Sequence, residues 1–149
     1  MNGSDIDVLL VEDNPDDAEF TLRALRKANV ALRVAHVDDG VKTLEFVFGT
    51  GAYAERASAA LPRLMLLDLK LPRVDGLEVL RRVKLDPRTR AMPVVVLTSS
   101  REERDIEEAY RLGTNSYIVK PVEYAELITK LSDLVRYWLQ LNEQPRPRS

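Results

Sequence analysis

The sequence predicts an α/β fold in which a five-stranded parallel sheet is doubly wound by helices on both faces. Strand-like and helix-like segments alternate about five times along the 149 residues, which is typical of such a sheet with right-handed crossovers. The run Leu64–Leu67 is wholly apolar, as central strands of a parallel sheet tend to be. With 45% hydrophobic residues, a chain of this length can bury one substantial core.

The predicted strands are short, mainly apolar runs. They are Asp7–Val11, Leu32–Val37, Leu64–Leu67, Val94–Leu97 and Ser116–Val119. The predicted helices carry apolar residues three or four positions apart. They begin at Asn14-Pro15 and continue with Val41–Phe48, Leu77 to about Asp86, Ile106–Leu112 and Tyr124–Trp138. Asn14 is suited to cap the first helix and Pro15 to its first turn, while Gly113 is suited to end the fourth.

Composition narrows the range of functions. The net charge of −2 gives no general attraction to nucleic acid or to anionic membranes. Cysteine is absent, which excludes disulfides and thiolate zinc sites. No apolar run approaches the roughly 20 residues of a membrane span, and the first residues do not resemble a signal peptide. We therefore expect a cytoplasmic protein that binds neither nucleic acid nor membranes.

The chain is predicted to form one domain. Residues 7–141 include the whole alternating pattern and an extended last helix. Residues 1–6 are expected to be a flexible N-terminus, and residues 142–149, rich in Pro and Arg, a disordered tail. Residues 49–62 form a long connection between the second helix and the third strand.

Polar side chains follow four of the predicted strands. They are Glu12-Asp13-Asn14, Asp68, Thr98-Ser99 and Lys120. The C-terminal ends of parallel strands lie on one edge of the sheet, where ligands bind in such folds. Residues far apart in sequence are therefore expected to meet in one pocket.

This set of residues suits phosphoryl transfer to Asp68. A carboxylate can attack phosphorus and form an acyl phosphate, but an anion must then approach an anion. Mg²⁺ can bridge the two, held by carboxylates from Glu12, Asp13 and Asp68. Lys120 and Thr98 would place an ammonium and a hydroxyl on phosphoryl oxygens.

Each segment alone has a simpler explanation. The acidic triplet at Glu12 suits a helix-capping loop, Asp68 a turn residue, Thr98-Ser99 a helix cap, and Lys120 a solvated lysine. Tyr117, in a predicted strand, is by default a core or half-buried aromatic. The combination of four strand ends, each with the required chemistry, favours the phosphoryl site.

These motifs resemble the receiver domain of two-component response regulators over residues 7 to 134. The segments that carry the resemblance are Val11–Pro15, Leu67–Pro72 with Asp75-Gly76-Leu77, Val96–Ser99 and Val119–Pro121. The resemblance implies a flavodoxin-like sheet with strand order 2-1-3-4-5. It implies that Asp68 is the phosphoacceptor and that Mg²⁺, for which Mn²⁺ or Ca²⁺ can substitute in crystals, is held by Glu12, Asp13, Asp68 and the carbonyl of Lys70.

Further roles follow from the same resemblance. Thr98 and Lys120 should contact the phosphoryl group, and the Lys120-Pro121 bond should be cis. Thr98 and Tyr117 should form a switch in which the hydroxyl moves toward the phosphoryl group and the aromatic ring turns inward. The fourth helix, fifth strand and last helix would present the resulting change to partners.

The resemblance also predicts the partners. The donor would be a sensor histidine kinase, and the motifs look like those of stand-alone regulators that work with phytochrome-type kinases. Lacking an output domain, the chain would act through protein contacts or phosphorelay. Apolar residues late in the last helix suggest a homodimer through that helix, the fifth strand and the Trp138 region, unless Trp138 folds back onto its own core. The lone His36, in the second strand, is interpreted as structural or half-exposed and not as a phosphodonor.

Three rival functions remain. An aspartate-nucleophile phosphatase usually has an acid two residues after the nucleophile, where this chain has Lys70. A pseudo-receiver adaptor would never be phosphorylated, although all the key side chains are present. A nucleotide-binding fold would need a glycine-rich loop after the first strand, and none occurs there. We expect no enzymatic role beyond self-phosphorylation and slow hydrolysis of the aspartyl phosphate.

Overall fold

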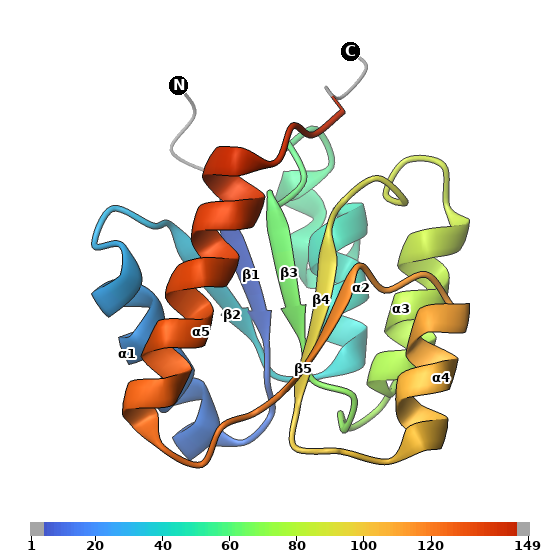
Figure 1. Ribbon diagram of the computed structural model, residues 1–149. Coiled ribbons are helices and arrows are strands. Elements are labelled where there is room, and N and C mark those ends of the chain that lie inside the picture. The colour runs from blue at the N-terminus through green and yellow to red at the C-terminus, as the bar shows by residue number, and fades with distance from the viewer. Residues whose placement is uncertain (1–4, 146–149) are drawn as a thin grey trace.

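The structure, a computed structural model, describes residues 5–145 and contains one parallel sheet. Its strand order, β2-β1-β3-β4-β5, confirms the predicted doubly wound topology (Figure 1). The strands are β1 (Val8–Val11), β2 (Val34–Val37), β3 (Leu64–Leu67), β4 (Val94–Thr98) and β5 (Ser116–Val119). The three central strands are buried throughout, which explains why all their residues except Thr98, at the end of β4, are apolar.

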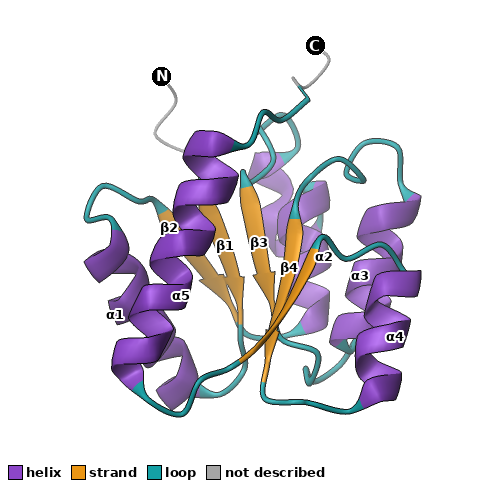
Figure 2. Ribbon diagram, in the orientation of Figure 1, coloured by secondary structure: helices purple, strands orange, loops and turns teal. Residues whose placement is uncertain are grey.

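Helices cover both faces of the sheet, as Figure 2 shows. Helices α1 and α5 pack on one face, and α2, α3 and α4 on the other. Their bounds are α1 (Pro15–Ala28), α2 (Gly40–Phe48), α3 (Gly76–Leu85), α4 (Glu103–Arg111) and α5 (Tyr124–Arg136). Alternate residues of each central strand therefore enter two separate cores, one on each side of the sheet.

The first two helices are capped at their starts by side chains. The Oδ1 atom of Asn14 accepts from the backbone N–H of Asp17 at 3.0 Å, and Pro15 occupies the first turn of α1, as predicted. Asp39 caps α2 in the same way, with its Oδ1 atom 2.7 Å from the backbone nitrogen of Lys42. These caps fix where the chain leaves the loops that follow β1 and β2.

The long connection after α2 is more regular than predicted. It contains a 3₁₀ helix, η1 (Gly51–Arg56), which folds back on α2. The ring of Tyr53 packs edge-on against Phe46 with centroids 5.1 Å apart, and the guanidinium of Arg56 lies 3.9 Å from the centroid of the same ring. A large aromatic surface at the end of α2 thus orders a segment whose own sequence gave no helical pattern.

The last helix continues as a π-helical turn, η2 (Tyr137–Leu141). Trp138 is half-buried against the core on the α1 and α5 side, so this side chain does fold back on its own domain. Arg63 Nη2 donates to the carbonyl of Leu139 at 2.6 Å, and Gln144 Nε2 donates to the carbonyls of Trp138 and Arg63. The part of the expected tail that is described therefore lies against the domain; residues 146–149, like residues 1–4, fall outside the described range.

Between residues 5 and 145, no helix combines the length and the apolar content that a membrane crossing requires.

Lys84 ties α3 to two loops at the edge of the sheet opposite the polar residues. Its ammonium donates to the carbonyls of Arg90 and Met92 and to Asn115 Oδ1, at 2.8 to 3.0 Å. Asn115 Oδ1 in turn accepts from the backbone of Val94 at 2.9 Å. Burial lowers the pKa of Lys84 to about 8.

We predict that wild type gains stability relative to Lys84→Met as the pH rises from about 8 to 10. A lysine whose pKa is lower in the folded state loses its proton there first, so the folded state binds fewer protons and rising pH favours it. The free energy of unfolding of wild type, minus that of Lys84→Met, should increase by about 1 kcal/mol over this range. A fully buried lysine would give a larger increase. Urea unfolding of both proteins at pH 7, 8, 9 and 10 measures this difference, and a constant difference would contradict the prediction.

Candidate functional site

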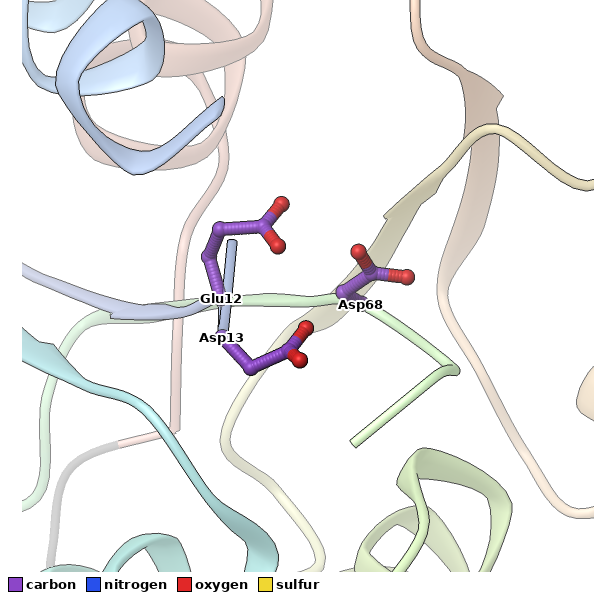
Figure 3. A group of neighbouring side chains, drawn as sticks. All are labelled: Glu12, Asp13 and Asp68. Atoms are coloured by element: carbon purple, nitrogen blue, oxygen red, sulfur yellow. The ribbon is translucent and has the colours of Figure 1, made fainter. Parts of the chain in front are cut away.

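The structure brings the predicted polar residues together at the C-terminal edge of the sheet. Glu12 and Asp13 follow β1, and Asp68 follows β3. Figure 3 shows these three side chains close together, and one carboxylate oxygen from each lies within 4.8 Å of the others. Glu12 and Asp68 are buried, whereas Asp13 is exposed. The group has the oxygen chemistry that Mg²⁺ prefers.

The register of the strands explains this gathering. Val11 of β1 pairs with Leu67 of β3, so the next residues, Glu12 and Asp68, leave the sheet side by side. The backbone N–H of Asp68 donates to the carbonyl of Val11 at 3.0 Å and continues the ladder one step past the strands. A shift of one residue would separate Glu12 from Asp68 and turn one of them to the other face of the sheet, so the observed register is what brings them together.

Lys120 supplies the positive charge of the site. It follows β5, and its backbone N–H donates to the carbonyl of Thr98 at 2.8 Å. Its Nζ atom donates to Asp68 Oδ2 at 2.8 Å, to a carboxylate oxygen of Glu12, and to Asp17 Oδ2 at 3.2 Å. Burial by itself lowers the pKa of Lys120, but the hydrogen bonds to Asp68 and Glu12 outweigh it and raise the pKa above its ordinary value.

Glu12 shows the electrostatic cost of this arrangement. Its side chain is 2% exposed, and burial raises its pKa to about 7. Hydrogen bonds from Lys120 and from the backbone of Asn14 oppose this rise, while the charge of Asp68 adds to it. Two buried carboxylates beside one ammonium leave negative charge unbalanced, so a further cation would relieve the site.

Both oxygens of Asp68 have partners. While Oδ2 accepts from Lys120, Oδ1 accepts from the hydroxyl of Thr98 at 2.9 Å and from the backbone N–H of Lys70 at 3.3 Å. Thr98 is fully buried at the end of β4. The carboxylate therefore lies between a hydroxyl and an ammonium, the two donors expected to contact a phosphoryl group.

Residues 8–132 match the sequence profile of the response regulator receiver domain, which is most of the chain. The chain belongs to this family. The match spans all five strands and the site at their C-terminal ends, and it confirms the resemblance drawn from the motifs.

Several known proteins are similar over nearly their whole length. The probable methanogenesis regulatory protein FilR2 of Methanothrix harundinacea is 39% identical, covering 94% of this chain and 88% of that protein. The phosphorylated cyanobacterial phytochrome response regulator RcpA superposes with a TM-score of 0.86 at 36% identity, covering 96% of this chain and all of that one. The bacteriophytochrome response regulator AtBRR is 48% identical, with a TM-score of 0.73 and coverages of 91% and 96%.

A metal-bound receiver is also among the similar structures. The Mn²⁺-bound form of response regulator Rcp1, a protein known from Synechocystis, has a TM-score of 0.83 and 32% identity. The alignment covers 93% of this chain and 98% of that structure.

Tyr117, the aromatic residue of the predicted switch, is partly buried and contacts the loop that follows β4. The hydroxyl of Tyr117 donates to the carbonyl of Ser100 at 3.0 Å, and burial raises the pKa of that hydroxyl. The backbone N–H of Ser100 lies 3.4 Å from Thr98 Oγ1, and its own hydroxyl donates to Asp105 Oδ2 in the first turn of α4 at 2.6 Å. A continuous series of contacts thus links Asp68 to α4.

Two contacts at the site were not predicted from the sequence. Asp17 shares Lys120 with Glu12 and Asp68, and the available signal was its place one turn into a helix that begins at the site. His36 Nε2 donates to the backbone carbonyl of Glu12 at 2.7 Å, because β2 lies beside β1. The bond of the Ser100 hydroxyl to Asp105 was not predicted either, because it depends on how α4 packs.

The expected cis bond between Lys120 and Pro121 is wrong for this structure, because no peptide bond among residues 5–145 is cis. The trans form is the lower in energy even before proline, by about 0.5–1 kcal/mol.

We predict that Lys120→Met lowers the free energy of unfolding of the metal-free protein by about 3–5 kcal/mol near neutral pH, since it leaves two buried carboxylates without their cation. Lys70→Met, at an exposed lysine beside the same site, is the control and should change stability by less than about 0.5 kcal/mol. Urea denaturation in the presence of a chelator measures both. Equal changes in the free energy of unfolding for the two substitutions would show that Lys120 does not stabilise the buried carboxylates.

Proposed function

We propose that this receiver accepts a phosphoryl group on Asp68 from a phosphohistidine of a sensor histidine kinase. The observation that carries the proposal is the position of the Asp68 carboxylate, between the acidic pair on one side and the donors Lys120 and Thr98 on the other. No other group of three or more acidic or histidine side chains in the described part of the chain has the geometry of a metal site.

The transfer exchanges one bond to phosphorus for another. A carboxylate oxygen of Asp68 forms a bond to phosphorus while the bond from phosphorus to the imidazole nitrogen of the donor breaks. The leaving nitrogen keeps the electron pair of that bond. The Lys120 ammonium and the Thr98 hydroxyl, which already bind the two oxygens of Asp68, are close enough to shift onto phosphoryl oxygens as negative charge moves there.

Glu12, Asp13, Asp68 and the backbone carbonyl of Lys70 would hold a Mg²⁺ ion. The ion supplies charge neutralisation between the carboxylate and the incoming phosphoryl group. The donor set fits it, because the three carboxylates converge and the buried Glu12 is destabilised as an anion. The Mn²⁺-bound form of Rcp1 supports the same assignment by similarity.

The phosphorylated state would be read through Thr98 and Tyr117. A phosphoryl group on Asp68 would change the partner of the Thr98 hydroxyl. Tyr117 is connected to that hydroxyl by Ser100, whose backbone contacts both side chains. The surface expected to change is α4, β5 and α5.

The upstream partner is proposed from the similar structures. RcpA and AtBRR are described as phytochrome and bacteriophytochrome response regulators, and we infer that a phytochrome-type kinase is the donor for this chain as well. The exchange would take place in the cytoplasm, where such kinases find ATP. FilR2 is described as a probable methanogenesis regulatory protein, so a different upstream partner is the alternative.

The test is the intact mass of the protein after incubation with a small acyl phosphate, with and without Mg²⁺. We expect a single phosphoryl addition that requires Mg²⁺ and is absent from Asp68→Asn. Asp13→Asn should reduce the addition at least tenfold at limiting Mg²⁺, because it removes a direct ligand. Asp16→Asn, at a nearby exposed acid in the first turn of α1, is the matched control and should behave as wild type.

Two results would overturn this function. No addition under any condition would favour the pseudo-receiver adaptor, which works without phosphorylation. Turnover of a phosphorylated small molecule, faster than hydrolysis of the protein's own acyl phosphate, would favour the aspartate-nucleophile phosphatase.

We also propose a homodimer through the C-terminal extension, α5 and β5. Tyr137 and Leu141 in η2 are 49% and 61% exposed, and contiguous exposed apolar side chains commonly mark interfaces. The bonds from Arg63 and Gln144 hold the backbone of this segment on the domain, so its outward side chains are pre-positioned. A two-fold contact is the commonest arrangement for such a pair.

The double substitution Tyr137→Ser with Leu141→Ser is expected to weaken this dimer at least tenfold without unfolding the domain. Trp138→Ala should weaken it too, but with a loss of stability, because Trp138 packs on the core. Light scattering at tens of micromolar measures the mass, with Val30→Ser, at a valine that is 89% exposed after α1, as the control. A monomeric wild type would remove the proposal.

A further inference from the structure

His36 is an exposed side chain that makes one directed contact with the acidic loop. It lies in β2, at the edge of the sheet, and pairs in register with Leu10 of β1. Its Nε2 atom donates to the backbone carbonyl of Glu12 at 2.7 Å, a distance typical of a good hydrogen bond. The side chain of His36 therefore contacts a residue two positions after its register partner Leu10, just past the end of β1.

The carbonyl of Glu12 belongs to the peptide that joins Glu12 to Asp13. That peptide decides how the two carboxylates of the acidic pair are directed relative to each other. Before it, the backbone N–H of Glu12 donates to the carbonyl of Val37 at 3.1 Å. After it, the backbone N–H of Asn14 donates to Glu12 Oε2 at 3.1 Å. His36 supplies the middle contact of the three, and β2 therefore holds Glu12 at both its N–H and its carbonyl.

This contact differs in kind from those of the carboxylates themselves. Glu12, Asp13 and Asp68 offer side-chain oxygens to one point, and His36 is not part of that group. His36 acts on the backbone behind the ligands. Residues behind metal ligands commonly fix ligand orientation, and their loss typically lowers metal affinity 10- to 100-fold.

We propose that His36 is a positioning residue for the divalent cation: by holding the peptide between Glu12 and Asp13, it keeps both carboxylates directed at Asp68. The inference rests on the proposed function, since it assigns His36 a role toward the ion that the three carboxylates would bind. Because His36 is exposed on an edge strand, its replacement opens no cavity in the core, and its effect on the ion can be measured in a folded protein.

The test is the affinity for Mn²⁺, measured by the electron paramagnetic resonance signal of the free ion, in three proteins. They are wild type, His36→Leu and His36→Gln. Leucine fills similar space but cannot donate, whereas the Gln amide can place a donor near the position of Nε2. We expect His36→Leu to bind Mn²⁺ about tenfold more weakly and His36→Gln to recover at least half of that loss on a logarithmic scale.

The possible results distinguish a failure of the role of His36 from a failure of the proposed function. If wild type binds Mn²⁺ and His36→Leu binds it within twofold, the positioning role is overturned while the receiver function stands. If the melting temperature of the metal-free Leu variant falls but its Mn²⁺ affinity does not, His36 is only structural. Equal weakening in the Leu and Gln variants would also overturn the role. If wild type binds neither Mn²⁺ nor Mg²⁺, the proposed function fails and this inference fails with it.

Discussion

The site depends on one ammonium group held among carboxylates from different parts of the chain. Lys120 binds Asp68 and Glu12, both buried, and also Asp17 at the start of α1. An unpaired charge in such a place would cost several kcal/mol, so the charged forms of Asp68 and Glu12 depend on their ion pairs with Lys120. Even with Lys120 present, the pKa of Glu12 is raised to about 7 because burial disfavours its charged form. The protein thus keeps a site whose negative charge is incompletely neutralised, and this charge favours the binding of a further cation.

The same contacts connect the site to the surface. Thr98 binds Asp68 from within the sheet, Ser100 follows Thr98 in the loop, and Tyr117 from β5 donates to the carbonyl of Ser100. The Ser100 hydroxyl then reaches the first turn of α4 through Asp105. Each group in this series is at least partly buried, so solvent would screen a change in charge at Asp68 only weakly. The loop between β4 and α4 is the segment through which a change at Asp68 would reach α4.

Strong local signals made most of the fold predictable. The strand Leu64–Leu67 was predicted with its observed bounds, because four consecutive apolar residues between polar segments suit a strand buried on both faces. The start of α1 was predicted from Asn14 and Pro15, whose preferences act within one turn. By contrast, the helix Gly51–Arg56 gave no signal, since it is held by contacts of Tyr53 and Arg56 with Phe46 rather than by its own periodicity. Strand β2 begins two residues later than predicted, as edge strands have weaker apolar patterns.

The sequence by itself determined which chemistry the protein has available. Residue type and position after each strand were enough to select Glu12, Asp13, Asp68, Thr98 and Lys120, because parallel strands must end on one edge of the sheet. Only the tertiary structure decided which other residues contact these site residues and their backbone. The contacts of Asp17 with Lys120, of His36 with Glu12 and of Ser100 with Asp105 depend on helix packing and on strand register. Such contacts join residues whose spacing carries no periodic signal, so they appear only once the strands and helices are packed together.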